Sequence, residues 1–79
     1  MRLDKYLKVS RIIKRRTVAN EACDAGRVMV NGKVARASLD VKVGDIIEIA
    51  FGNNTTRVEV LSVKESVRKD DAVLMYKSV

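Results

Sequence analysis

Basic side chains dominate the chemistry that this sequence offers. The chain has 79 residues and a net charge of +6, with 16 Lys and Arg against 10 Asp and Glu. Residues 1–36 carry a balance of +7, whereas residues 37–79 carry a balance of −1. A positive charge confined to one part of a protein is typical of a densely anionic partner, because each neutralised phosphate releases condensed counterions. The charge distribution therefore favours binding of nucleic acid.

Two other interpretations of the basic half compete with this one. A solvated surface chosen for solubility leaves the neutral second half without an explanation. An anionic membrane surface calls for an apolar face rich in Trp or Phe beside the basic residues, but the sequence has no Trp and a single Phe. We therefore predict nucleic acid as the partner and no membrane.

The residue types that usually carry catalysis or bind metals are scarce. The chain has no His, which removes the usual general base and the commonest metal ligand. Cys23 is the only cysteine and is expected to be a small core residue rather than a redox site. Asp70 and Asp71 are sequence neighbours and cannot converge on one helix face, and Asp45 is expected to bond local backbone in a turn. We predict no enzyme, no cofactor and no metal site.

Composition also bounds the architecture. Hydrophobic residues make up 47% of the chain, which predicts a folded domain rather than a disordered segment. The length predicts one domain over residues 1–79. The apolar stretches are far shorter than the ~20 residues that cross a bilayer, and no apolar signal segment follows Met1. A single cysteine fits a reducing compartment, so we expect a soluble cytoplasmic protein.

A first short helix is predicted almost at the N-terminus. Its apolar residues recur at the spacing of one helix face: Leu3, Tyr6 and Leu7. The basic residues Arg2, Lys5 and Lys8 then point away from that face. Two roles stay open for Asp4, which can pair with Lys8 one turn later or can orient a neighbouring arginine.

A basic turn and a second helix are predicted to follow. Residues 10–17 form the turn, with Ile12 and Ile13 directed into the core. Thr17 is the predicted N-cap and Gly26 the C-terminal stop of the helix. Its buried stripe is predicted to be Val18, Ala19, Ala22 and Cys23. Arg15 and Arg16 then stand just ahead of a helix N-terminus, whose free N–H groups and dipole favour a phosphate.

After Gly26 the hydrophobic period changes to that of strands. Asn31-Gly32 predicts a type I′ hairpin, with Lys33 at its tip and Val28 and Val30 in the first strand. Further strands are predicted at residues 46–51 and 55–63, with a turn between them. For the tail, a short helix over residues 70–75 and a final strand or frayed end at 76–79 are the expectations.

The aromatic residues indicate how nucleic acid would be recognised. Tyr6, Phe51 and Tyr76 are the only aromatics, and each is predicted to lie in the core. Binding of unpaired bases needs several exposed aromatic rings. We therefore expect recognition of the backbone and shape of a folded RNA.

This order of segments resembles a known family of RNA-binding domains. Helix, basic turn, helix, Gly-Arg-Val, Val-Asn-Gly hairpin and Val-Gly-Asp turn are similar to the domain named after ribosomal protein S4, the S4 domain. The matching segments are residues 2–7, 16–22, 26–32 and 43–47. The resemblance implies an α+β fold in which two N-terminal helices, the alpha-L motif, pack on a small, largely antiparallel sheet. RNA would then lie against the helices and the adjoining loop.

The resemblance also implies which residues bind RNA. The positions that match the basic RNA-facing positions of the family are Arg2, Lys5, Arg16 and Arg27. Lys14, Arg15 and Lys33 are expected to supplement them.

The free-standing bacterial members that act in ribosome-associated quality control are the most similar, and the small heat-shock member is more distant. They imply a cytoplasmic factor, here expected to be a monomer, that binds ribosomal RNA of the large subunit and a peptidyl-tRNA. A partner protein extends the stalled nascent chain meanwhile. The alternative is a ribosome-assembly or protein-docking adaptor, in which the basic half binds ribosomal RNA and the neutral half recruits a protein.

Overall fold

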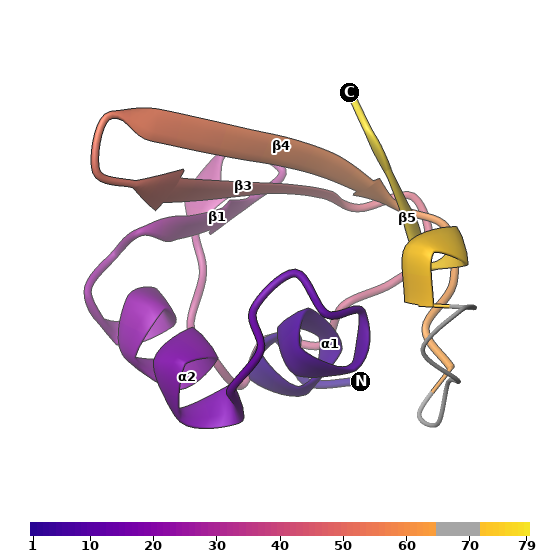
Figure 1. The fold of residues 1–79 in the computed structure, drawn as a ribbon, viewed down its shortest axis with the longest axis horizontal. Helices are drawn as coiled ribbons and strands as arrows, with labels where there is room; N and C mark the ends of the chain where they lie inside the picture. Colours follow the sequence, from indigo (N-terminus) through magenta and orange to yellow (C-terminus); the bar gives the residue numbers. More distant parts are fainter. Residues whose placement is uncertain (65–71) are drawn as a thin grey trace.

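The molecule has two layers, a sheet and a pair of helices that cover one of its faces (Figure 1). The computed structural model describes residues 1–64 and 72–79. The helices are α1 (Leu3–Val9), α2 (Arg16–Asp24) and the short 3-10 helix η1 (Ala72–Leu74). The strands are β1 (Val28–Val30), β2 (Lys33–Val34), β3 (Ile46–Phe51), β4 (Asn54–Val60) and β5 (Tyr76–Ser78).

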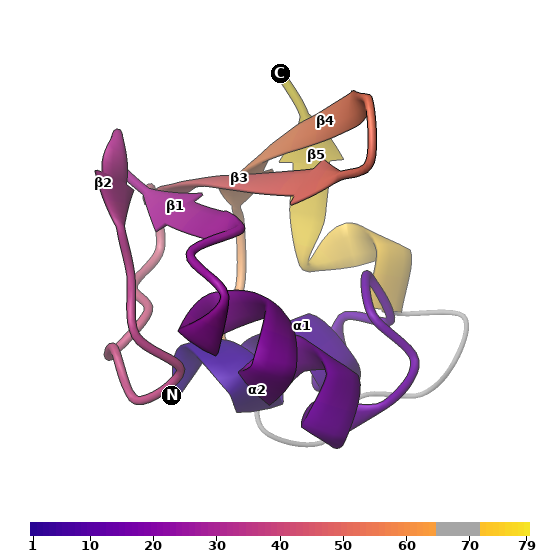
Figure 2. The same ribbon diagram turned by 90° about the vertical axis from the view of Figure 1, so that its left-hand side faces the viewer.

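The sheet has five strands in the order β2-β1-β3-β4-β5, and every neighbouring pair is antiparallel. Figure 2 shows β2 and β1 at one end of the sheet, with α2 lying below β1. Ile47 and Ile49 on β3, like Val58 and Val60 on β4, are fully buried against the helical layer. The residues between them face the other way, as the two-residue period of a strand requires. The predicted α+β fold is confirmed.

The β1–β2 connection is the type I′ hairpin that the sequence predicts. Asn31 and Gly32 both have positive φ, 53° and 82°. The Asn31 side chain also ties the hairpin to the start of β3, because its Oδ1 accepts from the Ile46 N–H at 3.0 Å and its Nδ2 donates to Asp45 at 3.1 Å. The other oxygen of Asp45 accepts from the Lys42 N–H at 2.9 Å. Asp45 therefore organises a turn, as expected.

Helix α1 is held on two sides. Leu3, Tyr6 and Leu7 are fully buried, as their spacing predicts. The chain around residues 37–41 runs beside the start of the helix, where the Leu3 N–H donates to the Leu39 carbonyl at 2.8 Å and the Asp4 N–H donates to the Ala37 carbonyl at 3.1 Å. These backbone bonds fix the position of the N-terminal turn that carries the first basic residues.

Helix α2 begins earlier than predicted. Thr17 is not its N-cap: the cap is Arg15, in extended conformation, and no side chain bonds to the free N–H groups there. The first turn closes when the Ala19 N–H donates to the Arg15 carbonyl at 3.1 Å. Ala19, Ala22 and Cys23 are buried as predicted. Val18 is 41% exposed, and its predicted burial is wrong because one residue of helix turns it about 100° away from the Ala19 face.

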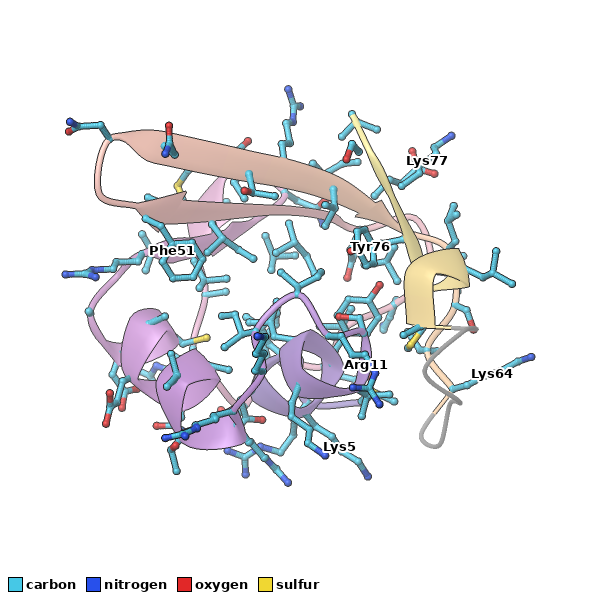
Figure 3. The ribbon with its side chains drawn as sticks, in the orientation of Figure 1. Lys5, Arg11, Phe51, Lys64, Tyr76 and Lys77 are labelled. Atoms are coloured by element: carbon cyan, nitrogen blue, oxygen red, sulfur yellow. The ribbon has the colours of Figure 1, made fainter. Side chains whose placement is uncertain are left out.

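Three further details differ from the sequence prediction. Phe51 is 40% exposed because it is the last residue of β3 and lies at the surface beside Val18 and Ala22 of α2, on the side of the sheet that faces the helices (Figure 3). Strand β4 ends at Val60 rather than 63, since the N–H groups of Leu61 and Ser62 donate to the Met75 carbonyl instead of extending the ladder. Tyr76 is half-buried, and it packs against the core without lying fully inside it.

The end of the chain forms a strand rather than a frayed tail. Strand β5 pairs with β4 through three residue pairs, including that of Tyr76 with Val60. Part of the helix predicted for residues 70–75 lies outside the described residues. The described part, η1, is a 3-10 turn that ends at Leu74.

Candidate nucleic-acid interface

A buried carboxylate joins the two helices. Asp4 on α1 is 2% exposed, and its oxygens accept from the Lys5 N–H at 2.8 Å and from Asn20 Nδ2 on α2 at 3.2 Å. Arg2 contacts both oxygens, with Nε at 3.3 Å and Nη2 at 3.4 Å. Arg16 Nε lies 3.5 Å from Oδ2. Of the two roles open for Asp4, orientation of arginines is the one that the structure shows.

The pKa of Asp4 reports a carboxylate that stays charged. Burial raises the pKa, but the bonds from Asn20, the Lys5 N–H and Arg16 outweigh burial and lower it below the ordinary 3.8. The guanidinium charge of Arg16 acts in the same direction. Asp4 is therefore a fixed negative charge at neutral pH, on which two arginines converge.

The two arginines keep most of their capacity to bind an anion. The side chains of Arg2 and Arg16 are 51% and 48% exposed, although both contact Asp4. One carboxylate shared by two guanidinium groups leaves one positive charge in excess. A guanidinium has five N–H donors in a planar fork, so contact with Asp4 uses only some of them. Because both side chains are about half exposed and contact the same carboxylate, their remaining donors are available to a phosphate group.

More positive charge gathers next to this pair. Lys14 and Arg15 precede Arg16 directly, are exposed, and form no ion pair within the described part of the chain. They stand at the N-terminus of α2, where no side chain caps the helix. The N–H groups of the first turn and the positive end of the helix dipole therefore remain available to an anion. The predicted combination of arginines with a helix N-terminus is present, with the N-cap two residues earlier, at Arg15 instead of Thr17.

Lys5 lies on the outer side of α1. Figure 3 shows its side chain pointing away from the sheet, on the side of the helical layer opposite the core. It is half-buried and follows Asp4 in the sequence. Lys5 therefore belongs with Arg2 and Arg16 as part of one basic surface over the helices.

Arg27 and Lys33 do not join this cluster. Arg16 is the first residue of α2 and Arg27 follows its C-terminal end, so the two lie toward opposite ends of this helix. Lys33 lies in the β1–β2 hairpin, beyond Asn31 and Gly32. Both are exposed and unpaired among the described residues. The predicted site residues thus divide into one compact group at the helices and two outlying cations toward the sheet.

The opposite face of the molecule is close to neutral. On the outer side of the sheet, Arg57 Nε lies 3.6 Å from Glu48 Oε1 across β3 and β4. Lys77 Nζ lies 4.0 Å from Glu59 Oε2 across β4 and β5. These cross-strand pairs match positive with negative charge on β3, β4 and β5, so the excess positive charge of the chain resides on the helical layer and around the β1–β2 hairpin.

Sequence reasoning missed the role of Asn20. Its amide donates to Asp4 and helps to hold the carboxylate between the helices. Asn20 is four residues after Arg16, so both side chains lie on one face of α2. This four-residue spacing was the only sequence signal that Asn20 shares a helix face with Arg16, and the interpretation considered the basic residues alone.

Cys23 behaves as the sequence predicts. It is buried in the core, and burial, followed by the nearby Asp4 and Asp24 carboxylates, raises the pKa of its thiol to about 11. A thiol with this pKa is protonated and unreactive near neutral pH. Among the residues that the structure describes, no three His, Cys, Asp or Glu side chains gather as metal ligands. None of the helices in this described part is long and apolar enough to span a bilayer.

Comparison with known proteins identifies the family of the chain. Residues 1–47 match the family model described as S4 domain. The RQC P-site tRNA stabilizing factor of Streptococcus pneumoniae is 60% identical over 79 residues, which cover 100% of this chain and 90% of that protein. The protein of the same name from Halalkalibacterium halodurans is 57% identical over 76 residues, covering 96% and 86%.

A solved structure has the same fold. The trimeric heat shock protein 15 of Vibrio cholerae superposes with a TM-score of 0.92 at 28% identity, over 100% of this chain and 81% of that one. Taken with the match over residues 1–47 and the identity to the two bacterial proteins, this likeness shows that the chain belongs to the S4-domain family, in the group named RQC P-site tRNA stabilizing factor.

Proposed function

We propose that this protein binds ribosomal RNA of the large subunit, and with it the P-site tRNA, during ribosome-associated quality control of stalled nascent chains. The observation that carries the proposal is the pair Arg2 and Arg16, held side by side on a buried carboxylate at the edge of an uncapped helix N-terminus. The names of the most similar relatives support the tRNA and the P site as the context.

The mechanism that we propose is a preorganised grip on phosphates. Asp4 and Asn20 fix the direction of two long side chains that would otherwise lose rotamer freedom on binding, which lowers the entropic cost of association. Lys14 and Arg15 add charge that attracts the polyanion before contact. Binding of this kind recognises the shape and backbone of a folded RNA and needs no base stacking.

Several finer points belong to the same proposal. The protein acts in the cytoplasm without catalysing a reaction, as a monomer, and it works beside a protein that extends the stalled chain. The monomeric state is tested by sedimentation, because the heat shock protein 15 relative is described as trimeric. The outlying Arg27 and Lys33 are proposed as secondary phosphate contacts.

Substitution of the arginine pair tests the proposed site. Arg16→Ala and Arg2→Ala should each weaken binding to purified large ribosomal subunits that carry P-site tRNA by about tenfold or more, because each removes a charge-assisted contact to phosphate. Arg57→Ala is the matched control, since Arg57 is as exposed as these arginines but is paired with Glu48 on the sheet. Equal affinity of Arg16→Ala and Arg57→Ala for these subunits would contradict the proposed site.

Recovery of the bound particles separates quality control from the alternative function. The neutral outer face of the sheet, with its two ion pairs, is the feature that a protein-docking adaptor in ribosome assembly would use. Quality control predicts that the tagged protein recovers free large subunits with tRNA. An assembly role predicts immature particles without tRNA.

A further inference from the structure

Arg11 adopts a backbone conformation that the other described residues show only at Asn31 and at glycines. Its φ is 64°, in the left-handed region. The other described residues with positive φ are Asn31 and the glycines Gly26, Gly32, Gly44 and Gly52. Glycine has no Cβ to clash in this region and Asn tolerates it, whereas a long side chain such as Arg is unfavourable there.

The fold requires this conformation at position 11. Helix α1 ends at Val9, and its C-cap Ser10 is 1% exposed and donates from Oγ to the Leu7 carbonyl at 3.3 Å. The chain then turns so that the Arg11 N–H donates to the Lys8 carbonyl at 3.1 Å and the Ile13 N–H donates to the Leu7 carbonyl at 3.0 Å. This turn brings Ile13 into the core. A left-handed residue after the last helical turn is the usual way to end a helix, and glycine is the residue that usually fills it.

No contact in the described structure offsets the backbone strain of an arginine at position 11. The Arg11 side chain is exposed and makes no hydrogen bond or ion pair with any described residue. Its neighbours Lys8 and Lys14 are also exposed cations, so local charge repels rather than attracts it. The negative end of the α1 dipole offers a weak attraction, which Lys8 in the last turn already satisfies. An arginine with a strained backbone and cationic sequence neighbours, which makes no bond to any described residue, points to a partner outside the chain.

We infer that Arg11 binds a phosphate of the RNA, and that the RNA-binding surface continues from the α1–α2 turn onto the C-terminal end of α1. This inference rests on the proposed function and deepens it. Lys8, Arg11 and Lys14 are spaced three residues apart along the turn that links the helices, and Lys14 directly precedes Arg15 and Arg16. Figure 3 shows Arg11 beside α1, in the same layer as Lys5 and away from the sheet. In this inference, the phosphate chain that contacts Arg16 passes along the turn to Arg11.

Arg11→Gly separates the charge of this residue from its structural place. Glycine suits the left-handed conformation better than arginine, so the melting temperature of the variant should equal or exceed that of the parent. Its affinity for large ribosomal subunits carrying P-site tRNA should nevertheless fall, by about tenfold for one lost charge-assisted contact. Arg11→Lys keeps the charge and should retain most of the affinity. All measurements are made well below the melting temperatures.

Arg16→Ala and Arg57→Ala, measured in parallel, make the failures distinguishable. Unchanged affinity of Arg11→Gly beside weakened Arg16→Ala would overturn the inference and leave the proposed function standing. Unchanged affinity of both variants would overturn the proposed function and the inference with it. A loss of affinity in Arg11→Gly that only follows a fall in melting temperature would show a structural role and would also sink the inference.

Discussion

Asp4 sets how the arginine pair of the interface is presented. It is acidic, buried and in contact with two cations, so its own charge is neutralised while each arginine is drawn to a defined position. A charge this deep is tolerated only with good partners, since burial alone favours the neutral form. Here the pKa of Asp4 is lowered, so the hydrogen bonds to Asp4 and the charge of Arg16 outweigh the effect of burial. The carboxylate therefore serves both the packing of α1 on α2 and the binding surface.

Asp4→Asn should reduce the free energy of unfolding by about 1–3 kcal/mol at neutral pH, because an amide cannot satisfy both arginines and leaves them uncompensated. The parent should also lose stability on acidification. The folded pKa of Asp4 is lowered, so the unfolded state binds more protons as the pH falls through 3.8 and below, and stability falls with it. Urea unfolding measured from pH 6 to pH 2.5 checks both effects. Parallel pH profiles for the parent and the variant would show that Asp4 contributes nothing to the acid sensitivity.

At the scale of elements, one hydrogen bond joins the first helix to the last strand. The Tyr6 hydroxyl on α1 donates to the Met75 carbonyl at 2.8 Å, just before β5. Burial, with the nearby Tyr76, raises the pKa of Tyr6 far above its ordinary value, so the hydroxyl remains a donor throughout the physiological range. The same carbonyl accepts from Leu61 and Ser62. One atom thus ties α1, the end of β4 and β5 together.

Tyr6→Phe should cost about 0.5–1.5 kcal/mol, the net value of one neutral hydrogen bond. A larger loss is not expected, because the Met75 carbonyl keeps its two backbone donors and no buried acceptor is left unsatisfied. Tyr76→Phe is the control, since the Tyr76 hydroxyl makes no hydrogen bond within the described residues. Chemical denaturation measures both variants. A loss for Tyr6→Phe no greater than that for Tyr76→Phe would show that the bond does not stabilise the fold.

Local chemistry explains which elements could be predicted from the sequence. The Asn31-Gly32 hairpin was predictable because only residues that tolerate positive φ fit a type I′ turn. The start of α2 was not, since Thr17 is the better intrinsic cap, whereas the helix begins at Arg16, whose side chain contacts Asp4 on α1. Strand β4 likewise ends where the Met75 carbonyl takes over its donors. Errors fall where a tertiary contact overrides a local preference.

The candidate site follows the same division. That basic residues gather over the helices was predictable from charge balance, and the structure places Arg2, Lys5 and Arg16 there together. That Asp4 and Asn20 hold the arginines in place was not predictable, because it depends on how α1 crosses α2. The left-handed backbone of Arg11 was equally hidden, since residue spacing carries no information on φ at a helix end.

At the scale of the whole molecule, the excess positive charge lies on the helices and the β1–β2 hairpin, whereas the rest of the sheet is close to neutral. Residues 1–36, which build both helices and the hairpin, carry a balance of +7. The acids Glu48 and Glu59 lie on the outer face of the sheet, where Arg57 and Lys77 pair with them. A field of this shape orients the protein during approach, so that the helical layer meets a polyanion first. The affinity for RNA and the rate of association should therefore both depend on the salt concentration, because salt screens the charges.

Salt dependence measures how many phosphates the helical layer neutralises. For each phosphate contacted, log K for RNA should fall with log of the salt concentration by about 0.7 to 0.9. Titration with potassium chloride at fixed magnesium should give the parent a slope several times this value, because it contacts several phosphates. Arg16→Ala should make the slope shallower by about the value for one phosphate, whereas Arg57→Ala should leave it unchanged because that charge is already paired on the sheet. If the affinity proved insensitive to salt, phosphates could not be the groups that the helical layer binds.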